Sequence, residues 1–132
     1  MREPDKVPIL RLEHEYHNLA NDYYRISEYD KAIENYTRAL NISPSQMESY
    51  FNRALAHTRK SQYDRALLDL NKAIGINPAI PEVYYTRGLV YEQMNDYRRA
   101  VDDYNKALEL DPTYTEAFNQ RKIAYAKVKK DN

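Results

Sequence analysis

The sequence predicts an all-α fold in which seven helices form successive helix-turn-helix hairpins that stack into a solenoid. Three observations support this prediction: residue types recur every 34 positions, apolar residues within each period are spaced by three and four, and each period ends at a proline. The content of only two glycines in 132 residues argues against turn-rich β folds and against glycine-rich phosphate loops.

The 34-residue period is visible in several columns of equivalent positions. One column consists of Tyr29, Tyr63 and Tyr97. The same step relates three further sets and carries a fourth into an incomplete unit: Ala32, Ala66 and Ala100; Ala39, Ala73 and Ala107; Pro44, Pro78 and Pro112; and Tyr16, Tyr50, Tyr84 and Phe118. Such regularity indicates that each period folds as one supersecondary unit.

Apolar residues within the first period follow helical spacing. A first stripe occupies positions i, i+3, i+4 and i+7: Tyr16, Leu19, Ala20 and Tyr23. A second stripe runs from Tyr29 to Leu40 and ends before Pro44, which lacks an N–H and disfavours helix in the preceding residue. Each period is therefore predicted to be a helix A followed by a helix B.

Capping residues are expected where each helix B begins. Ser27 and Ser61 each stand three residues before an Asp, which is a variant of the capping box, and Asn95 is the equivalent residue of the third period. The expected helices cover residues 9–26, 29–41, 46–60, 63–75, 80–94, 97–109 and 114–129.

The expected organisation is one domain with a tail, three repeats and a closing helix. Its parts are an N-terminal tail (1–8), repeat 1 (9–46), repeat 2 (47–80), repeat 3 (81–114) and a C-terminal capping helix with its tail (115–132). In the last helix Lys122 replaces the small residue found at Ala20, Ala54 and Gly88, so no helix B is expected to close on that face.

These residues resemble the tetratricopeptide repeat (TPR) family, whose pattern combines aromatic and small residues in helix A, Tyr and Ala in helix B, and a final Pro. The likeness covers residues 13–114, with 115–128 as a partial fourth unit. Arg53 and Arg87 depart from the pattern at an apolar position and His57 at a Tyr, and we expect these changes to loosen the second repeat without altering the fold. The resemblance implies a right-handed α-solenoid with the A helices on its concave side.

The resemblance also implies that helix A residues not used in packing face a concave groove. We expect this groove to bind a protein or peptide partner through aromatic and aliphatic contacts, with amides that hydrogen-bond the backbone. The predicted binding residues are Asn21, Tyr24, Phe51, Asn52, Leu55, Arg59, Tyr85, Leu89, Asn119 and Ile123. The alternative interpretation is that the aliphatic members pack between successive A helices and the aromatic members are packing residues too.

Members of the family that hold the C-terminal carboxylates of heat-shock chaperones use a clamp of Lys, Asn, Asn, Lys and Arg. Asn21 and Asn52 match its two Asn positions, but His17 replaces the first Lys, and Glu82 and Thr86 replace the last Lys and Arg. Because Glu82 would repel a carboxylate, chaperone-tail binding is not predicted.

A second functional hypothesis is self-assembly. Short repeat arrays can stack end to end, and Leu12 and Tyr125 lie in the first and last helices, where they could join neighbouring copies. This alternative makes the protein a homo-oligomer built through its terminal helices.

The sequence does not favour catalysis or a bound cofactor. His14 and His17 are spaced like metal ligands, but no Cys and no further His stands near them, so no metal site is expected. Asp102 and Asp103 are interpreted as solvated acids on the surface of a helix B. No phosphate-binding loop or nucleophile motif is present, so we expect no enzyme.

Charge and hydropathy limit the class of partner and the location. Twenty basic and twenty acidic residues leave no net charge, so nucleic acid is not the expected partner despite a basic last helix. No stretch reaches the roughly 20 apolar residues that span a bilayer. We expect a cytoplasmic protein with no membrane insertion.

Overall fold

The computed structural model describes residues 6–130, and within them seven helices and no strand are found. The helices are α1 (Lys6–Arg25), α2 (Tyr29–Ile42), α3 (Met47–Arg59), α4 (Tyr63–Ile76), α5 (Pro81–Gln93), α6 (Tyr97–Leu110) and α7 (Thr115–Lys130). The predicted bounds agree to within one residue, except that α1 begins at Lys6 and not at residue 9. Residues 1–5 of the predicted tail lie outside the described residues.

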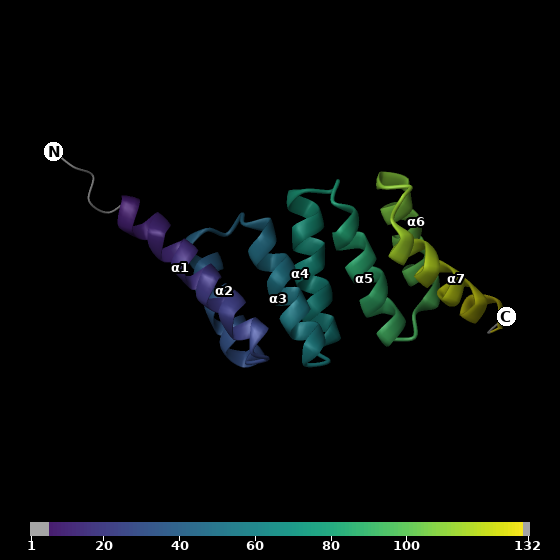
Figure 1. Ribbon diagram of the computed structural model, residues 1–132, viewed down its shortest axis with the longest axis horizontal. Coiled ribbons are helices and arrows are strands. Elements are labelled where there is room, and N and C mark those ends of the chain that lie inside the picture. The colour runs from purple at the N-terminus through teal and green to yellow at the C-terminus, as the bar shows by residue number, and fades with distance from the viewer. Residues whose placement is uncertain (1–5, 131–132) are drawn as a thin grey trace. The chain divides into compact units, whose positions relative to one another are not determined.

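The chain forms two compact units, with the division inside α4 after Lys72. In the N-terminal unit α1 packs against α2, and α2 packs against α3 (Figure 1). In the C-terminal unit α5 packs against α6, and α6 packs against α7. Within each unit, helices that follow one another in the chain are therefore neighbours, as the predicted hairpins require.

Small residues let paired helices approach closely. In the N-terminal unit Ala20 and Ala32 are completely buried beside the ring of Tyr36. In the C-terminal unit a Cβ atom added to Gly88 would lie only 2.6 Å from the ring of Tyr104. The predicted interlock of small and aromatic residues is thus present in both units.

The turns between helices A and B differ from the prediction. The residues predicted as N-caps all adopt positive φ angles, of 64°, 58° and 61°: Ser27, Ser61 and Asn95. Each one closes the preceding helix A, and the residue after it donates a backbone hydrogen bond five residues back, as Glu28 does to Tyr23. The N-cap prediction is therefore wrong, and in the third hairpin Asp96 caps α6 by accepting from the Arg99 amide.

Two partly buried ion pairs join helix A to helix B. Arg53 donates from Nε and Nη2 to the two Asp69 carboxylate oxygens, at 2.8 and 2.7 Å. Arg87 binds Asp103 in the same two-pronged way, at 2.9 and 2.8 Å. The prediction that Asp103 is a solvated surface acid is wrong, because this residue is only 4% exposed. The two arginines that depart from the family pattern thus each have a buried partner 16 residues later.

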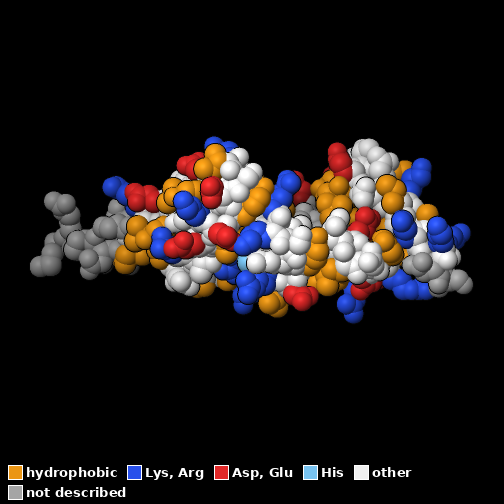
Figure 2. Space-filling model, turned by 90° about the horizontal axis from the view of Figure 1, so that it is seen from below, with side chains coloured by type: hydrophobic (Ala, Val, Ile, Leu, Met, Phe, Trp, Pro, Cys, Tyr) orange, Lys and Arg blue, Asp and Glu red, His pale blue; other side chains and the backbone are white. Residues whose placement is uncertain are grey.

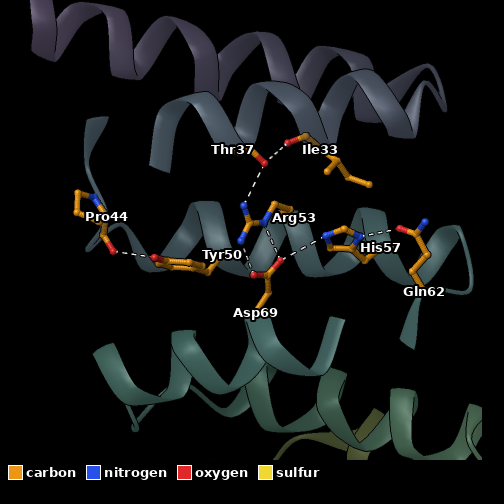
Figure 3. Close-up of polar contacts among 8 residues, drawn as sticks. All are labelled: Ile33, Thr37, Pro44, Tyr50, Arg53, His57, Gln62 and Asp69. Atoms are coloured by element: carbon orange, nitrogen blue, oxygen red, sulfur yellow. Dashed lines mark hydrogen bonds and ion pairs between the residues drawn. The ribbon is translucent and has the colours of Figure 1, made fainter. Parts of the chain in front are cut away.

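The Arg53–Asp69 pair belongs to a larger polar network in the N-terminal unit (Figure 3). Arg53 Nη1 donates to Thr37 Oγ1 of α2 at 3.0 Å, so this one guanidinium contacts α2 and α4 from α3. The buried His57 gives Gln62 Oε1 a hydrogen bond at 2.8 Å, and its Nε2 lies 3.7 Å from Asp69 Oδ2. His57, which stands where the family pattern has a Tyr, is therefore surrounded by polar partners that suit an imidazole.

The first hairpin lacks this pair. Leu19 and Asn35 occupy the positions that are Arg and Asp in the next two hairpins. Asn35 Nδ2 donates to the Lys31 carbonyl at 2.8 Å, while its buried Oδ1 has no hydrogen-bond partner among the described residues.

The close contact at Gly88 predicts opposite effects of one substitution at the two glycines. Gly88→Ala should destabilise the protein by about 1–3 kcal/mol, because the new methyl group would displace the Tyr104 ring. Gly75→Ala, in open space inside α4, should stabilise it by about 0.5–1 kcal/mol. Urea unfolding followed by circular dichroism measures both, and a Gly88→Ala variant as stable as wild type would show that the contact is not tight.

Candidate functional site

A pocket of about 270 Å³ lies among three helices of the N-terminal unit. Its lining residues come from α1, α2 and α3: Asn21, Tyr24, Arg25, Tyr36, Asn52 and Leu55. Four of them belong to the predicted binding set: Asn21, Tyr24, Asn52 and Leu55. The structure thus brings together, around one cavity, residues that are up to 34 positions apart in the sequence.

The two asparagines are joined at the pocket by hydrogen bonds. Asn21 Oδ1 accepts from the Tyr36 hydroxyl and, at 3.3 Å, from Asn52 Nδ2. Burial raises the pKa of Tyr36 to about 12, so its hydroxyl keeps the donated proton at neutral pH. Among the described residues, Asn21 Nδ2 and Asn52 Oδ1 have no hydrogen-bond partner. The Asn21 amide nitrogen, as donor, and the Asn52 amide oxygen, as acceptor, therefore remain for a ligand.

Aromatic and cationic side chains surround these amides. Tyr24 packs against the buried cluster around Tyr36, and its hydroxyl accepts from Arg59 Nε at 3.3 Å. Nη2 of the exposed Arg25 lies 2.9 Å from Asp22 Oδ1, so this carboxylate neutralises part of the Arg25 charge. Phe51 of α3 is half-buried and does not line the pocket.

The predicted residues of the C-terminal unit lie in two environments. Tyr85 packs against Tyr104 and Tyr114, whose ring centroids lie 5.8 and 5.1 Å from its own. Leu89 packs against the buried cluster that contains Tyr104. Tyr85 and Leu89 therefore contribute to packing inside this unit. On α7, by contrast, the side chains of Asn119 and Ile123 are exposed, Ile123 by 52%.

Sequence reasoning missed the polar role of two buried tyrosines. Tyr36 supports Asn21, and Tyr104, two periods later, donates from its hydroxyl to Glu92 Oε1 at 3.0 Å. Gln120 Nε2 donates to the other Glu92 oxygen at 3.1 Å. A buried tyrosine hydroxyl needs a partner, so Tyr36 and Tyr104 themselves were the signal for a polar residue on the facing helix A.

The two histidines considered as metal ligands have other partners. His17 Nδ1 is hydrogen-bonded to Ser49 Oγ at 2.8 Å, and His14 Nε2 lies 3.3 Å from a Glu13 oxygen. Within residues 6–130, no group of three or more potential ligands is assembled. In the same part of the chain, no helix has both the length and the apolar character of a membrane span.

Comparison with known families identifies the repeat. A model described as tetratricopeptide repeat matches residues 81–114, and another, described as TPR repeat, matches residues 20–61 and 57–95. The chain belongs to the tetratricopeptide repeat family. The TPR fold indicates a protein–protein interaction scaffold, and its members are generally non-catalytic interaction modules. No curated protein matches the sequence.

Solved TPR structures resemble the chain over most of its length. The first TPR of Spaghetti (RPAP3) bound to HSP90 peptide SRMEEVD has 27% identity and a TM-score of 0.86, covering 89% of this chain and 94% of that one. The Sgt2 TPR domain from Aspergillus fumigatus has 26% identity and a TM-score of 0.84, covering 91% and 81%. The predicted fold class, an all-α array of TPR-like hairpins, is confirmed.

The environment of Glu92 predicts a pH dependence of stability. Burial raises its pKa above the ordinary 4.5, while Tyr104 and Gln120 oppose the shift by hydrogen bonding to the charged form. Because the folded pKa is the higher one, the contribution of Glu92 is fully present below pH 4.5 and is lost as pH rises through the folded pKa.

The free energy of unfolding of Glu92→Gln should therefore fall less than that of wild type as the pH rises from about 4 to about 7. Urea unfolding across this range measures the difference. A curve for Glu92→Gln that runs parallel to that of wild type would contradict the expected shift.

Proposed function

We propose that this TPR chain is a non-catalytic scaffold that binds a peptide or protein segment on its A helices, with the pocket around Asn21 and Asn52 as the central contact. The observation that carries the proposal is the unused donor and acceptor at the pocket, Asn21 Nδ2 and Asn52 Oδ1. A peptide bond offers one carbonyl acceptor and one N–H donor, which complement these groups. The peptide complex of the Spaghetti (RPAP3) domain supports this class of ligand.

The other residues around the pocket suit an apolar side chain of the bound segment. Tyr24 and Leu55 provide rigid apolar contact area beside the amides, and Arg59 stands at the edge with its charge exposed. An apolar centre with a polar rim is the usual composition of a binding hot spot. The remaining proposed contacts are Phe51, Tyr85, Leu89, Asn119 and Ile123.

We further propose that the ligand is not the carboxylate tail of a chaperone. Of the five clamp positions, only Asn21 and Asn52 are retained. His17 is hydrogen-bonded to Ser49, Glu82 adds an exposed negative charge, and Thr86 is buried. Carboxylates that leave water need cationic partners, and these three positions supply no permanent cation.

Binding should depend on Leu55 and not on an equally large residue elsewhere. Peptides selected from a random library on wild-type protein provide the ligand. Leu55→Ala should weaken their binding by about 2 kcal/mol if Leu55 is a hot spot. Leu68→Ala, which truncates a leucine of α4 that is 70% exposed, should bind as wild type in the same titration.

Two results would contradict the groove proposal. One is a Leu55→Ala variant that retains wild-type affinity. The other is selected peptides that bind Leu68→Ala and Leu55→Ala equally weakly. Self-assembly through the terminal helices becomes the better explanation if, in addition, Leu12→Glu or Tyr125→Glu changes the sedimentation coefficient, since these side chains are 40% and 51% exposed.

The peptide SRMEEVD tests the exclusion of chaperone tails directly. Isothermal titration of this peptide into the wild-type chain should give a Kd weaker than about 1 mM, because the three clamp cations are replaced by His17, Glu82 and Thr86. The selected peptides serve as the positive control, because their binding shows that the protein sample is folded and able to bind a peptide. Micromolar binding of SRMEEVD would show that the clamp works with a different residue set.

A further inference from the structure

One arginine in each of the last two hairpins lies in a recurring setting. The Arg53 guanidinium lies over the Tyr50 ring at 5.7 Å, and Arg87 lies over Tyr84 at the same distance. Each then binds an aspartate of the following helix B through two hydrogen bonds. The aromatic ring three residues earlier and the buried carboxylate together define the setting.

Arg121 of α7 repeats this setting without the carboxylate. It is the next position in the same 34-residue column, and its guanidinium lies 5.6 Å from the Phe118 ring. Its Nη1 donates to Asn105 Oδ1 of α6 at 2.9 Å, as Arg53 Nη1 donates to the equivalent Thr37 at 3.0 Å. Within the described residues, Arg121 has no acidic partner.

A pocket is present beside this guanidinium. It has a volume of about 290 Å³ and lies between α6 and α7, lined by Val101, Asn105, Arg121, Lys122 and Tyr125. In the N-terminal unit, the equivalent α2–α3 junction is covered by α4, since Arg53 contacts both Thr37 and Asp69. Among the described residues, only α6 and α7 line the pocket of the C-terminal unit.

We propose that an acidic amphipathic helix of a partner protein docks on α6 and α7 at this pocket, with an Asp or Glu bound by Arg121 through two hydrogen bonds. The Arg53 and Arg87 pairs provide the geometry for this contact within the same protein. A guanidinium that is already oriented by a ring and a side-chain amide loses little freedom when a carboxylate binds it.

Charge selects an acidic helix for this position. Lys122 is the equivalent of Ala54 and Gly88 in the 34-residue period, and Gly88 leaves room for the Tyr104 ring of α6. A docked helix with the sequence of α6 would therefore place this large, mainly apolar side chain against the Lys122 ammonium group. A carboxylate there would instead be paired. Helix α7 carries five basic residues: Arg121, Lys122, Lys127, Lys129 and Lys130. Figure 2 shows basic side chains gathered at the C-terminal, basic end of the chain. Two copies joined through α7 would repel each other.

The probe for the experiment is derived from α6 itself. A helix-stapled peptide of residues 97–110, carrying Arg98→Glu, Arg99→Glu and Tyr104→Glu, keeps Asp103 and the buried alanines of α6, and its new residue 104 presents a carboxylate to Lys122. A second peptide adds Asp103→Asn, which removes only the charge expected to bind Arg121. Fluorescence anisotropy measures the binding of both peptides to the full chain.

The proposal predicts a specific pattern of affinities. Arg121→Gln should weaken the first peptide by about tenfold or more, whereas Lys130→Gln, which removes the same charge from the same helix, should weaken it less than about twofold. With the Asp103→Asn peptide, Arg121→Gln should have little further effect, as a double-mutant cycle requires for a direct pair. Circular dichroism verifies that both variants remain folded.

Several outcomes would overturn the proposal. These are no peptide binding at about 1 mM, equal effects of the two substitutions, or an Arg121 effect that persists with the Asp103→Asn peptide. Displacement of the peptide by a uridine oligonucleotide or by phosphatidylserine vesicles at lower concentration would mean that the basic end binds a polyanion instead of a helix. All of these results concern α6 and α7, and none bears on the pocket around Asn21.

Discussion

The guanidinium–carboxylate pair between helix A and helix B is the interaction on which the second and third hairpins depend. Arg53 and Arg87 replace an apolar residue of the family pattern, and each guanidinium is partly buried against the carboxylate of a buried aspartate. A buried pair adds little net stability compared with apolar packing, but loss of one partner leaves an uncompensated charge. The pair therefore fixes which faces of helices A and B meet, and it does so with a directional contact that apolar packing lacks.

The pocket of the N-terminal unit also depends on a polar contact that apolar packing holds in place. Ala20 and Ala32 bring α1 and α2 close enough to bury Tyr36, and the hydroxyl of that tyrosine then orients Asn21 toward Asn52. In the C-terminal unit Tyr104 directs its hydroxyl to Glu92 in a similar way. In both units a buried tyrosine hydroxyl thus donates a hydrogen bond to a polar side chain of the facing helix A, and this occupies one of that side chain's acceptor oxygens.

Features that follow from periodicity were predictable from one sequence. The columns of Tyr, Ala and Pro predicted the hairpins and nearly all helix bounds, because helix formation and close packing depend on residue type at regular spacing. The polar pairs were not predicted. A charge on an otherwise apolar face was interpreted as a local departure, since its partner lies on another helix, 16 residues away.

The turns and the pocket contacts were less predictable for related reasons. Ser27 has the composition of an N-cap, yet the tight reversal requires a left-handed residue at that position, and residue type alone does not distinguish the two. The residues around the first pocket were partly anticipated from the TPR pattern. The link from Tyr36 to Asn21 was not, because it depends on where a buried hydroxyl points.

The 16-residue separation between each arginine and its aspartate has a kinetic consequence. A contact between neighbouring helices closes only a short loop, so the chain loses little conformational entropy before the contact forms. Because helices that follow one another in the chain pack together within each unit, most contacts are local in sequence. Proteins with such low contact order fold quickly, and repeat arrays can nucleate at more than one place. Each of the second and third hairpins can accordingly form its ion pair without waiting for contacts with distant parts of the chain.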